Sequence, residues 1–75
     1  MKRVITFPNL EIELIRAHIS KGDLAKEINI SIASLYSKLR GDTQFTLSEV
    51  RDIKYLLETK LDKEYSYEYL FKTDV

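Results

Sequence analysis

The chain has no cysteine and no tryptophan, only two glycines and one proline, and a formal net charge of zero over its 75 residues. The lack of cysteine excludes disulfide bonds and thiolate metal sites. No apolar run is long enough for a membrane span or a signal peptide, so we expect a cytoplasmic protein with no membrane partner. A chain this short forms one domain, residues 1–75, and its small core would gain from a homodimer.

Residues that could carry catalysis or bind a metal are also sparse. The single histidine, His18, has no second ligand type placed to join it, and it suits a position near the C-terminal end of a helix. The acidic pairs Glu11 with Glu13 and Asp62 with Glu64 are spaced like solvated charges. The two glycines are too far apart to form a phosphate-binding loop. We therefore expect no enzyme activity, no cofactor, no metal and no small-molecule substrate.

What the sequence does contain is a pattern of two short helices joined by a tight turn, over residues 20–41. Ser20 can cap the first helix, and Leu24, Ala25 and Ile28 give it an apolar stripe at one-turn spacing. Helices this short cannot each bury a face alone, so they must pack on each other and on the rest of the domain.

The second of these helices has distinct inward and outward faces. Asn29 tolerates the left-handed conformation that ends the first helix, Ser31 can cap the second, and Gly41 can end it. Leu35 and Leu39 lie one turn apart and should face inward. Steps of about 100° per residue from Leu35 place four side chains on the opposite face. These are Ala33, Tyr36, Ser37 and Arg40, with Ile32 at the border.

This pattern resembles the Cro/repressor type of helix-turn-helix protein, in particular its small phage- and prophage-encoded members. The match is carried by DLAKEINIS, by S-x-x-x-L-Y-x-K-L-x-G from Ser31 to Gly41, and by the DTQFTLSEV that follows. It covers roughly residues 9–57. The resemblance implies a mainly α fold, namely a four-helix lambda-repressor-like domain. The chain departs from the family at Asn29, where glycine is usual, and at Lys21, where a glutamine that contacts the DNA backbone is common.

The resemblance implies double-stranded DNA as the partner, read in the major groove by a homodimer that represses transcription. Ile32 and Ala33 stand where glutamine, arginine or serine is expected, yet both can pack on a thymine methyl group. Tyr36 is either a core aromatic or a contact to a phosphate or base edge. Lys38 lies to one side of this face, where it is as consistent with a solvated surface residue as with a DNA contact. The expected base-facing residues are Ile32, Ala33, Tyr36 and Ser37, and the expected phosphate-contacting residues are Lys21, Arg40, Thr43 and Gln44.

The neutral net charge is the observation least favourable to DNA binding, because phosphate neutralisation supplies most non-specific affinity. Residues 1–45 carry seven basic and five acidic side chains, a net charge of +2, and residues 46–75 carry five and seven, a net charge of −2. This weak dipole partly offsets the neutral net charge, and so small a basic surplus favours a dimer. The neutral net charge, together with the apolar start of the second helix, supports an alternative hypothesis. In it the chain is a protein-interaction module, an anti-repressor or the partner of a larger regulator.

The segments that flank the motif predict two further helices and a small sheet. A β-branched run at residues 2–7 predicts a strand, and a helix capped by Asn9 should follow it, although residues 10–13 also alternate like a continued strand. That helix is apolar on two sides and must be sandwiched. Its two sides are Leu10, Leu14 and Ala17, and Ile12, Ile15 and Ile19.

After residue 41, Thr46 and Glu49 form a capping box for a helix that should reach about Lys60. The tail, residues 63–75, contains three tyrosines at alternate positions, which predicts a strand paired with residues 2–7 in a two-stranded β addition. In an alternative interpretation its aromatic side chains dock on a second subunit. The inward stripe of the capped helix is expected to be Leu47, Val50, Ile53 and Leu57.

Overall fold

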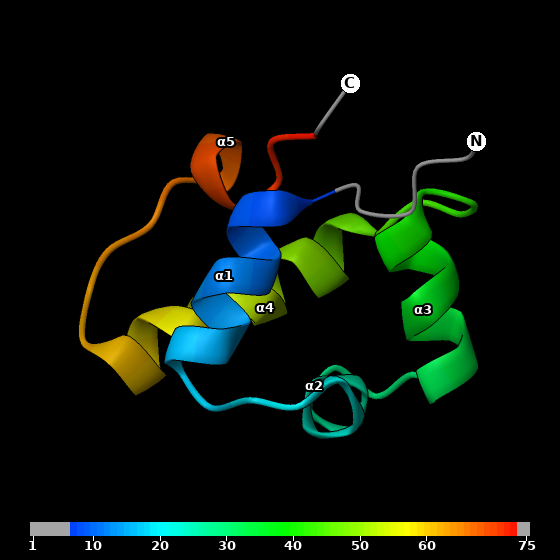
Figure 1. Ribbon diagram of the computed structural model, residues 1–75, viewed down its shortest axis with the longest axis horizontal. Helices are drawn as coiled ribbons and strands as arrows, with labels where there is room; N and C mark the ends of the chain where they lie inside the picture. The colour runs from blue at the N-terminus through cyan, green and yellow to red at the C-terminus, as the bar shows by residue number, and fades with distance from the viewer. Residues whose placement is uncertain (1–6, 74–75) are drawn as a thin grey trace.

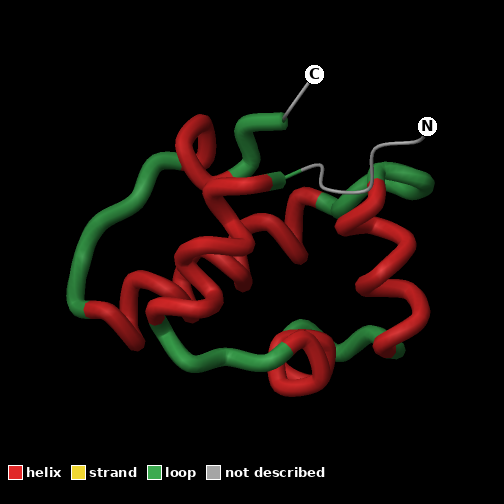
Figure 2. Tube along the Cα trace, in the orientation of Figure 1, coloured by secondary structure: helices red, strands yellow, loops and turns green. Residues whose placement is uncertain are grey.

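The computed structural model describes residues 7–73, and this part of the chain is mainly helical (Figures 1 and 2). Within these residues there are five helices and no strand. The prediction of a mainly α fold is therefore confirmed. In chain order the helices are α1 (Pro8–Arg16), α2 (Lys21–Glu27), α3 (Ile32–Arg40), α4 (Leu47–Leu61) and α5 (Tyr67–Leu70).

Hydroxyl side chains begin four of these helices, and the sequence predicts three of them, at Ser20, Ser31 and Thr46. Ser20 and Ser31 each accept a hydrogen bond from the backbone N–H three residues further on, at 3.0 and 3.1 Å. The capping box of α4 is complete, because Thr46 accepts from the Glu49 backbone N–H and the Glu49 carboxylate accepts from the Thr46 backbone N–H. Each bond satisfies an N–H group that the start of a helix would otherwise leave without a partner.

Two residues in the left-handed region redirect the chain after α2 and after α3. Asn29, just past α2, has φ 63°, and Gly41, which ends α3, has φ 87°. Glycine adopts this conformation without a steric penalty and asparagine at a small one. The predictions that these two residues end their helices are confirmed.

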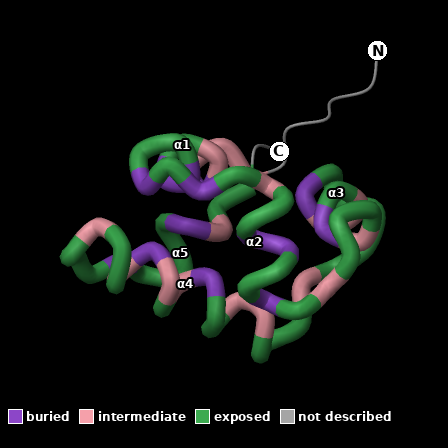
Figure 3. The backbone as a smooth tube through the Cα atoms, turned by 90° about the horizontal axis from the view of Figure 1, so that it is seen from below, coloured by how far each residue is buried: buried purple, intermediate pink, exposed green. Residues whose placement is uncertain are grey.

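Apolar residues from all five helices form one core. Figure 3 shows where the buried residues lie along the backbone. The inward stripes predicted for α2 and α3 are buried, as are Ile53 and Leu57 of α4. Leu47 is 78% exposed, so its place in the α4 stripe is a wrong prediction. It lies about 120° around the helix from Ile53, which turns it away from the core. The most deeply buried side chains are Leu10, Leu14, Leu24, Leu35, Ile53, Leu57, Leu70 and Glu13.

The tail does not form the predicted strand. Residues 67–70 make the single turn of α5, whose N–H of Tyr69 donates to the Ser66 hydroxyl at 3.0 Å. Leu70 is completely buried, so the helical turn carries this side chain into the core. The β addition is therefore wrong for residues 63–73, and residues 2–6 of its proposed partner strand lie outside the described residues.

The tail covers a different side of α1 from the one predicted. Leu10 and Leu14 are buried, whereas Ile12 is 45% and Ile15 74% exposed. α5 packs on α1 from the side of Glu13, whose carboxylate accepts from the Tyr69 hydroxyl, rather than from the isoleucine side. The prediction that both apolar sides of α1 are covered is therefore wrong for these two isoleucines, as far as residues 7–73 are concerned. Ile19, which lies beyond the end of the helix, is buried.

The start of α1 is fixed by its contacts with the tail. Pro8 occupies the first turn and Phe7 the N-cap position, so the prediction that Asn9 caps this helix is wrong. The Asn9 side chain instead donates to the backbone carbonyl of Tyr69 at 2.9 Å. This bond ties the first turn of α1 to α5.

Three phenylalanines join segments that are far apart in the sequence. Phe7 precedes α1, Phe45 precedes α4 and Phe71 follows α5. Their ring centroids are 5.6–5.8 Å apart, in tilted and edge-on arrangements. Such pairs stabilise beyond the area they bury. We call these three residues the phenylalanine cluster, and it connects both ends of the described chain to the loop after α3.

Gly22→Ala should stabilise the domain by about 0.5–1 kcal/mol, because alanine is the better helix former and Gly22 lies in α2 without a positive φ. A methyl group at this position would lie 3.9 Å from Ile32 Cδ1, an ordinary contact. Urea denaturation followed by circular dichroism measures the change. Gly41→Ala is the matched control and should destabilise, since its φ of 87° strains any other residue. Destabilisation by both variants would contradict this account.

Candidate nucleic-acid interface

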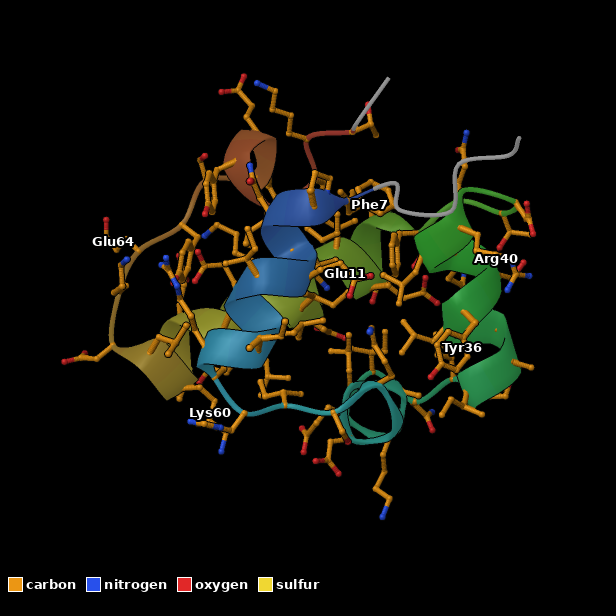
Figure 4. The ribbon with its side chains drawn as sticks, viewed as in Figure 1. Phe7, Glu11, Tyr36, Arg40, Lys60 and Glu64 are labelled. Atoms are coloured by element: carbon orange, nitrogen blue, oxygen red, sulfur yellow. The ribbon has the colours of Figure 1, made fainter. Side chains whose placement is uncertain are left out.

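α3 presents a mixed apolar and polar face to solvent. Its opposite face is buried through Leu35 and Leu39, which leaves Ala33 exposed, Ile32 47% exposed and Tyr36 43% exposed. Tyr36 is therefore not a core aromatic. Figure 4 shows Tyr36 and Arg40 on α3, at the end of the molecule away from Glu64. Three of the four residues expected to face bases thus share an accessible surface.

The position of this face is set by the packing of α3 on α2. Leu24 and Ala25 of α2 are buried in the same core as Leu35, and the small Ala25 side chain allows the two helices to approach closely. Ile32 reaches back toward Gly22 at the start of α2. The first turns of both helices are consequently close to one another.

Ser37, the fourth expected base-facing residue, is half-buried and bonded to the following loop. Its hydroxyl accepts a hydrogen bond from Thr43 Oγ1 at 3.4 Å, and its backbone carbonyl accepts from the Asp42 N–H at 3.0 Å. Thr43 is exposed despite this bond. Ser37 therefore holds the loop onto the end of α3 more than it projects from the helix.

The two basic residues expected to contact phosphates are both ion-paired with carboxylates. Arg40 Nε and Nη2 each lie 3.0 Å from the same Asp42 carboxylate oxygen, and this pair is exposed. Lys21 Nζ lies 2.9 Å from Glu11 Oε1, across the gap between α2 and α1. Any phosphate would have to compete with these carboxylates, which lowers the positive potential of the surface.

Lys38 is not the solvated residue that the sequence allowed. Its ammonium lies 3.0 Å from the Glu49 carboxylate with both side chains largely buried, and it donates to the Gln44 carbonyl at 3.1 Å. It also lies over the Phe45 ring. Lys38 therefore fastens α3 to the start of α4, and Gln44 keeps an exposed side chain while its backbone carbonyl is used in the loop.

The pKa of Glu49 reflects this site. Partial burial raises the pKa of the Glu49 carboxyl. Hydrogen bonds from the Thr46 backbone and from Lys38, together with the positive charge of the lysine, lower that pKa by more. The net pKa is below the usual 4.5. The carboxylate therefore stays ionised and keeps Lys38 engaged at neutral pH.

A second group of polar side chains lies away from α3. The carboxylate of Glu13 is 1% exposed and accepts hydrogen bonds from the hydroxyls of Tyr65 and Tyr69, both at 2.7 Å, with Arg16 3.4 Å away. The prediction that Glu13 is a solvated charge is wrong, because two residues of the tail cover it. This group borders an open hollow of about 380 Å³. Since the carboxylate is fully engaged, we assign the group a role in holding the tail.

Of the other residues considered for chemistry, Glu11 is half-buried beside Lys21, and His18, Asp62 and Glu64 are exposed. His18 follows the end of α1 with φ 58°, and Asp62, with φ 53°, ends α4. Glu64 also lies at the surface. Within residues 7–73 no group of three potential metal-ligating side chains comes together.

No helix among the described residues combines the length and the apolar content of a membrane span. Comparison of the chain with protein-family models, with curated proteins and with solved structures found no match.

Proposed function

We propose that the chain is a sequence-specific double-stranded DNA-binding transcriptional regulator with a lambda-repressor-like arrangement of α1–α4, similar to the Cro-type repressors of phages and prophages. The observation that carries the proposal is the accessible outward face of α3. Ile32, Ala33 and Tyr36 project from a capped helix that packs on α2 through its opposite face. A helix held in this way can enter a major groove.

The mechanism follows from the chemistry of that face. Ile32 and Ala33 would pack on thymine methyl groups, and the Tyr36 hydroxyl would reach a base edge or a phosphate. Arg40, Lys21 and the loop residues after α3 would contact the backbone and set the register. Two copies on adjacent half-sites would then block polymerase. With few strong hydrogen-bonding groups at the front of α3, specificity would also depend on DNA shape.

Selection of bound duplexes from a random pool at low salt tests the proposal most directly. We expect an enriched site, and an inverted repeat within it would show that two copies bind one duplex. Fluorescence anisotropy on that site then separates the roles of the side chains. Tyr36→Ala should change the preferred site sequence. Arg40→Ala should weaken binding to all duplexes, and it should reduce the slope of log affinity against log salt by about the amount that one phosphate contact contributes. No binding to any duplex at low salt would reject the proposal.

Asp42→Asn should strengthen binding to DNA by about twofold to fivefold and steepen its salt dependence, because it releases Arg40 for a phosphate. Anisotropy titrations between about 50 and 200 mM salt measure both quantities. Asp62→Asn, which removes the same charge at the end of α4, is the matched control. Equal gains from the two variants would mean that net charge alone is responsible, and that Asp42 does not restrain Arg40.

A second candidate function is a protein-interaction module, an anti-repressor or a regulator's partner. The ion pairs at Lys21 and Arg40 favour it, as does the exposure of Ile32 and Tyr36 on one face. Gel filtration with and without a pool of random duplexes distinguishes the two. A peak that does not shift at low salt favours the interaction module.

A further inference from the structure

The surface of α4 carries three side chains, each one turn from the next, that run from acidic through apolar to basic. They are Asp52, Leu56 and Lys60, and we call them the α4 row. Asp52 and Lys60 are exposed and Leu56 is half-buried, while Tyr55 beside the row is 71% exposed. Side chains spaced four apart form the ridges by which helices interlock. The row runs along the flank of α4 beside the buried stripe, since Lys60 lies about 20°, Leu56 about 60° and Asp52 about 100° around the helix from Ile53.

Two hollows lie along the α4 row, where α4 faces α2. One of about 310 Å³ is bordered by Asp52, Tyr55 and Glu27. The other, of about 160 Å³, is bordered by Lys60 and His18. Leu56 and Glu27 border both, so the two hollows are neighbours, and each could receive a side chain from another molecule.

The order of charges along the α4 row makes it complementary to itself. When a second copy is turned by 180° about an axis through Leu56, each Asp52 comes opposite the partner's Lys60. The apolar middle of one row then meets the apolar middle of the other, with Tyr55 beside it. Contacts of this kind, in which one patch meets the same patch, are the ones that close a two-fold dimer.

We propose that the α4 row is the surface through which two copies of this chain associate, by antiparallel packing of their α4 helices. The row is separate from the outward face of α3, so the proposal does not depend on what α3 binds. A single helix face is small beside the roughly 800 Å² that each partner buries in a stable complex. We therefore expect a weak, concentration-dependent dimer with a dissociation constant of micromolar order or weaker.

Sedimentation equilibrium of the full chain without DNA, up to millimolar concentration, tests the pairing through charge reversal. Asp52→Lys and Lys60→Asp should each weaken dimerisation about tenfold or more, because each creates two like-charge contacts in the symmetric dimer. The double variant D52K/K60D should restore the dissociation constant to within about threefold, since it reverses the row without changing net charge. Tyr55→Ala should also weaken association.

Controls separate the α4 row from general charge effects. Glu68→Lys and Lys72→Glu change the net charge by the same amounts at exposed positions of the tail, and both should dimerise like the unaltered chain. Circular dichroism confirms folding of each variant. A chain that stays monomeric up to millimolar concentration would overturn the proposal. Dimerisation that survives both single reversals, or that the double variant does not restore, would also overturn it, and would point to another face such as Ile12 and Ile15 of α1.

Discussion

Glu13→Ala should lower the free energy of unfolding by about 3 kcal/mol, a large part of the stability of a domain this small. The substitution removes the acceptor of two 2.7 Å hydrogen bonds, from Tyr65 and Tyr69, and leaves the buried Tyr65 hydroxyl without a partner. Charged acceptors make stronger hydrogen bonds than neutral ones. When the acceptor is removed, the buried donor has lost its bonds to water without gaining a partner in the protein, and this lowers stability. Urea denaturation followed by circular dichroism measures the effect.

Glu13→Gln is the matched control for this prediction. Its amide can accept from one tyrosine hydroxyl and donate to the other, so it should lose less than half as much stability. Tyr65→Phe and Tyr69→Phe each remove one bond and should fall between the unaltered chain and Glu13→Ala. A loss below about 1 kcal/mol for Glu13→Ala would contradict this prediction. It would show that the free energy lost by desolvating the carboxylate nearly cancels the free energy gained from its hydrogen bonds.

The same group makes stability depend on pH. Burial raises the pKa of Glu13, but hydrogen bonds from the two tyrosines and the positive charges of Arg16 and Lys63 lower it more, so the net pKa is below 4.5. A lowered pKa gives stability that is present above the unfolded value and is lost as pH falls through the folded value. Burial and the bond to Glu13 raise the pKa of Tyr65 from 10.0 to about 12. Stability from Tyr65 is therefore complete below pH 10 and is lost as pH rises toward about 12.

Thermal unfolding recorded across the pH range tests both limits. The melting temperature of the unaltered chain should fall below pH 4.5 and again above pH 10. In Glu13→Gln the acid-side fall should be smaller, although Glu49 and Glu58, whose pKa values are also lowered, will keep part of it. An unchanged acid limb would mean that Glu13 does not govern stability there.

The parts of the fold that the sequence predicted correctly are those set by residues close together in the chain. The caps at Ser20, Ser31 and Thr46 depend on bonds that span three residues, and Gly41 ends α3 through its own φ. The buried stripe of α3 follows from the helical period alone. Local chemistry therefore located α2, the turn after it and α3 without knowledge of the rest of the domain.

The errors at Glu13 and in the tail involve contacts between distant residues. Glu13 appeared to be a solvated charge because Tyr65 and Tyr69, more than fifty residues away, are what bury it. The alternating tyrosines suggested a strand, but the capping bond at Ser66 and the burial of Leu70 favour a helical turn. The Ser66 cap is as local as the caps at Ser20 and Ser31, but no short-range pattern shows that the tail covers Glu13 or that Leu70 enters the core.

The candidate interface shows the same division. The outward direction of Ile32 and Tyr36 followed from the helical period, and these side chains are accessible. The partner of Lys21 is Glu11, in another helix, and no pattern in the sequence pointed to it. Asp42, only two residues from Arg40, was the one clue that the arginine is partly neutralised.

Phe45→Ala should destabilise the domain by about 2–3 kcal/mol, less than for a fully buried phenylalanine because Phe45 is half-buried. It removes two of the three ring contacts in the phenylalanine cluster, those to Phe7 and to Phe71. The loss should therefore appear in three places. Hydrogen exchange by mass spectrometry should be faster at the start of α1 and in α5 as well as in the loop after α3, with α2 little changed.

The same substitution tests whether the loop after α3 depends on the tail. Phe45 lies between Lys38, which holds the loop to α3, and Phe71, which belongs to the tail. Phe45→Leu should keep most of the stability, and Leu47→Ala, which truncates a side chain already exposed to solvent, should change it by less than about 0.5 kcal/mol. Faster exchange confined to residues 42–50 in Phe45→Ala would contradict the coupling. Faster exchange in α5 as well would mean that the loop and the tail are stabilised together, so that Thr43 and Gln44 keep their positions through residues at the far end of the chain.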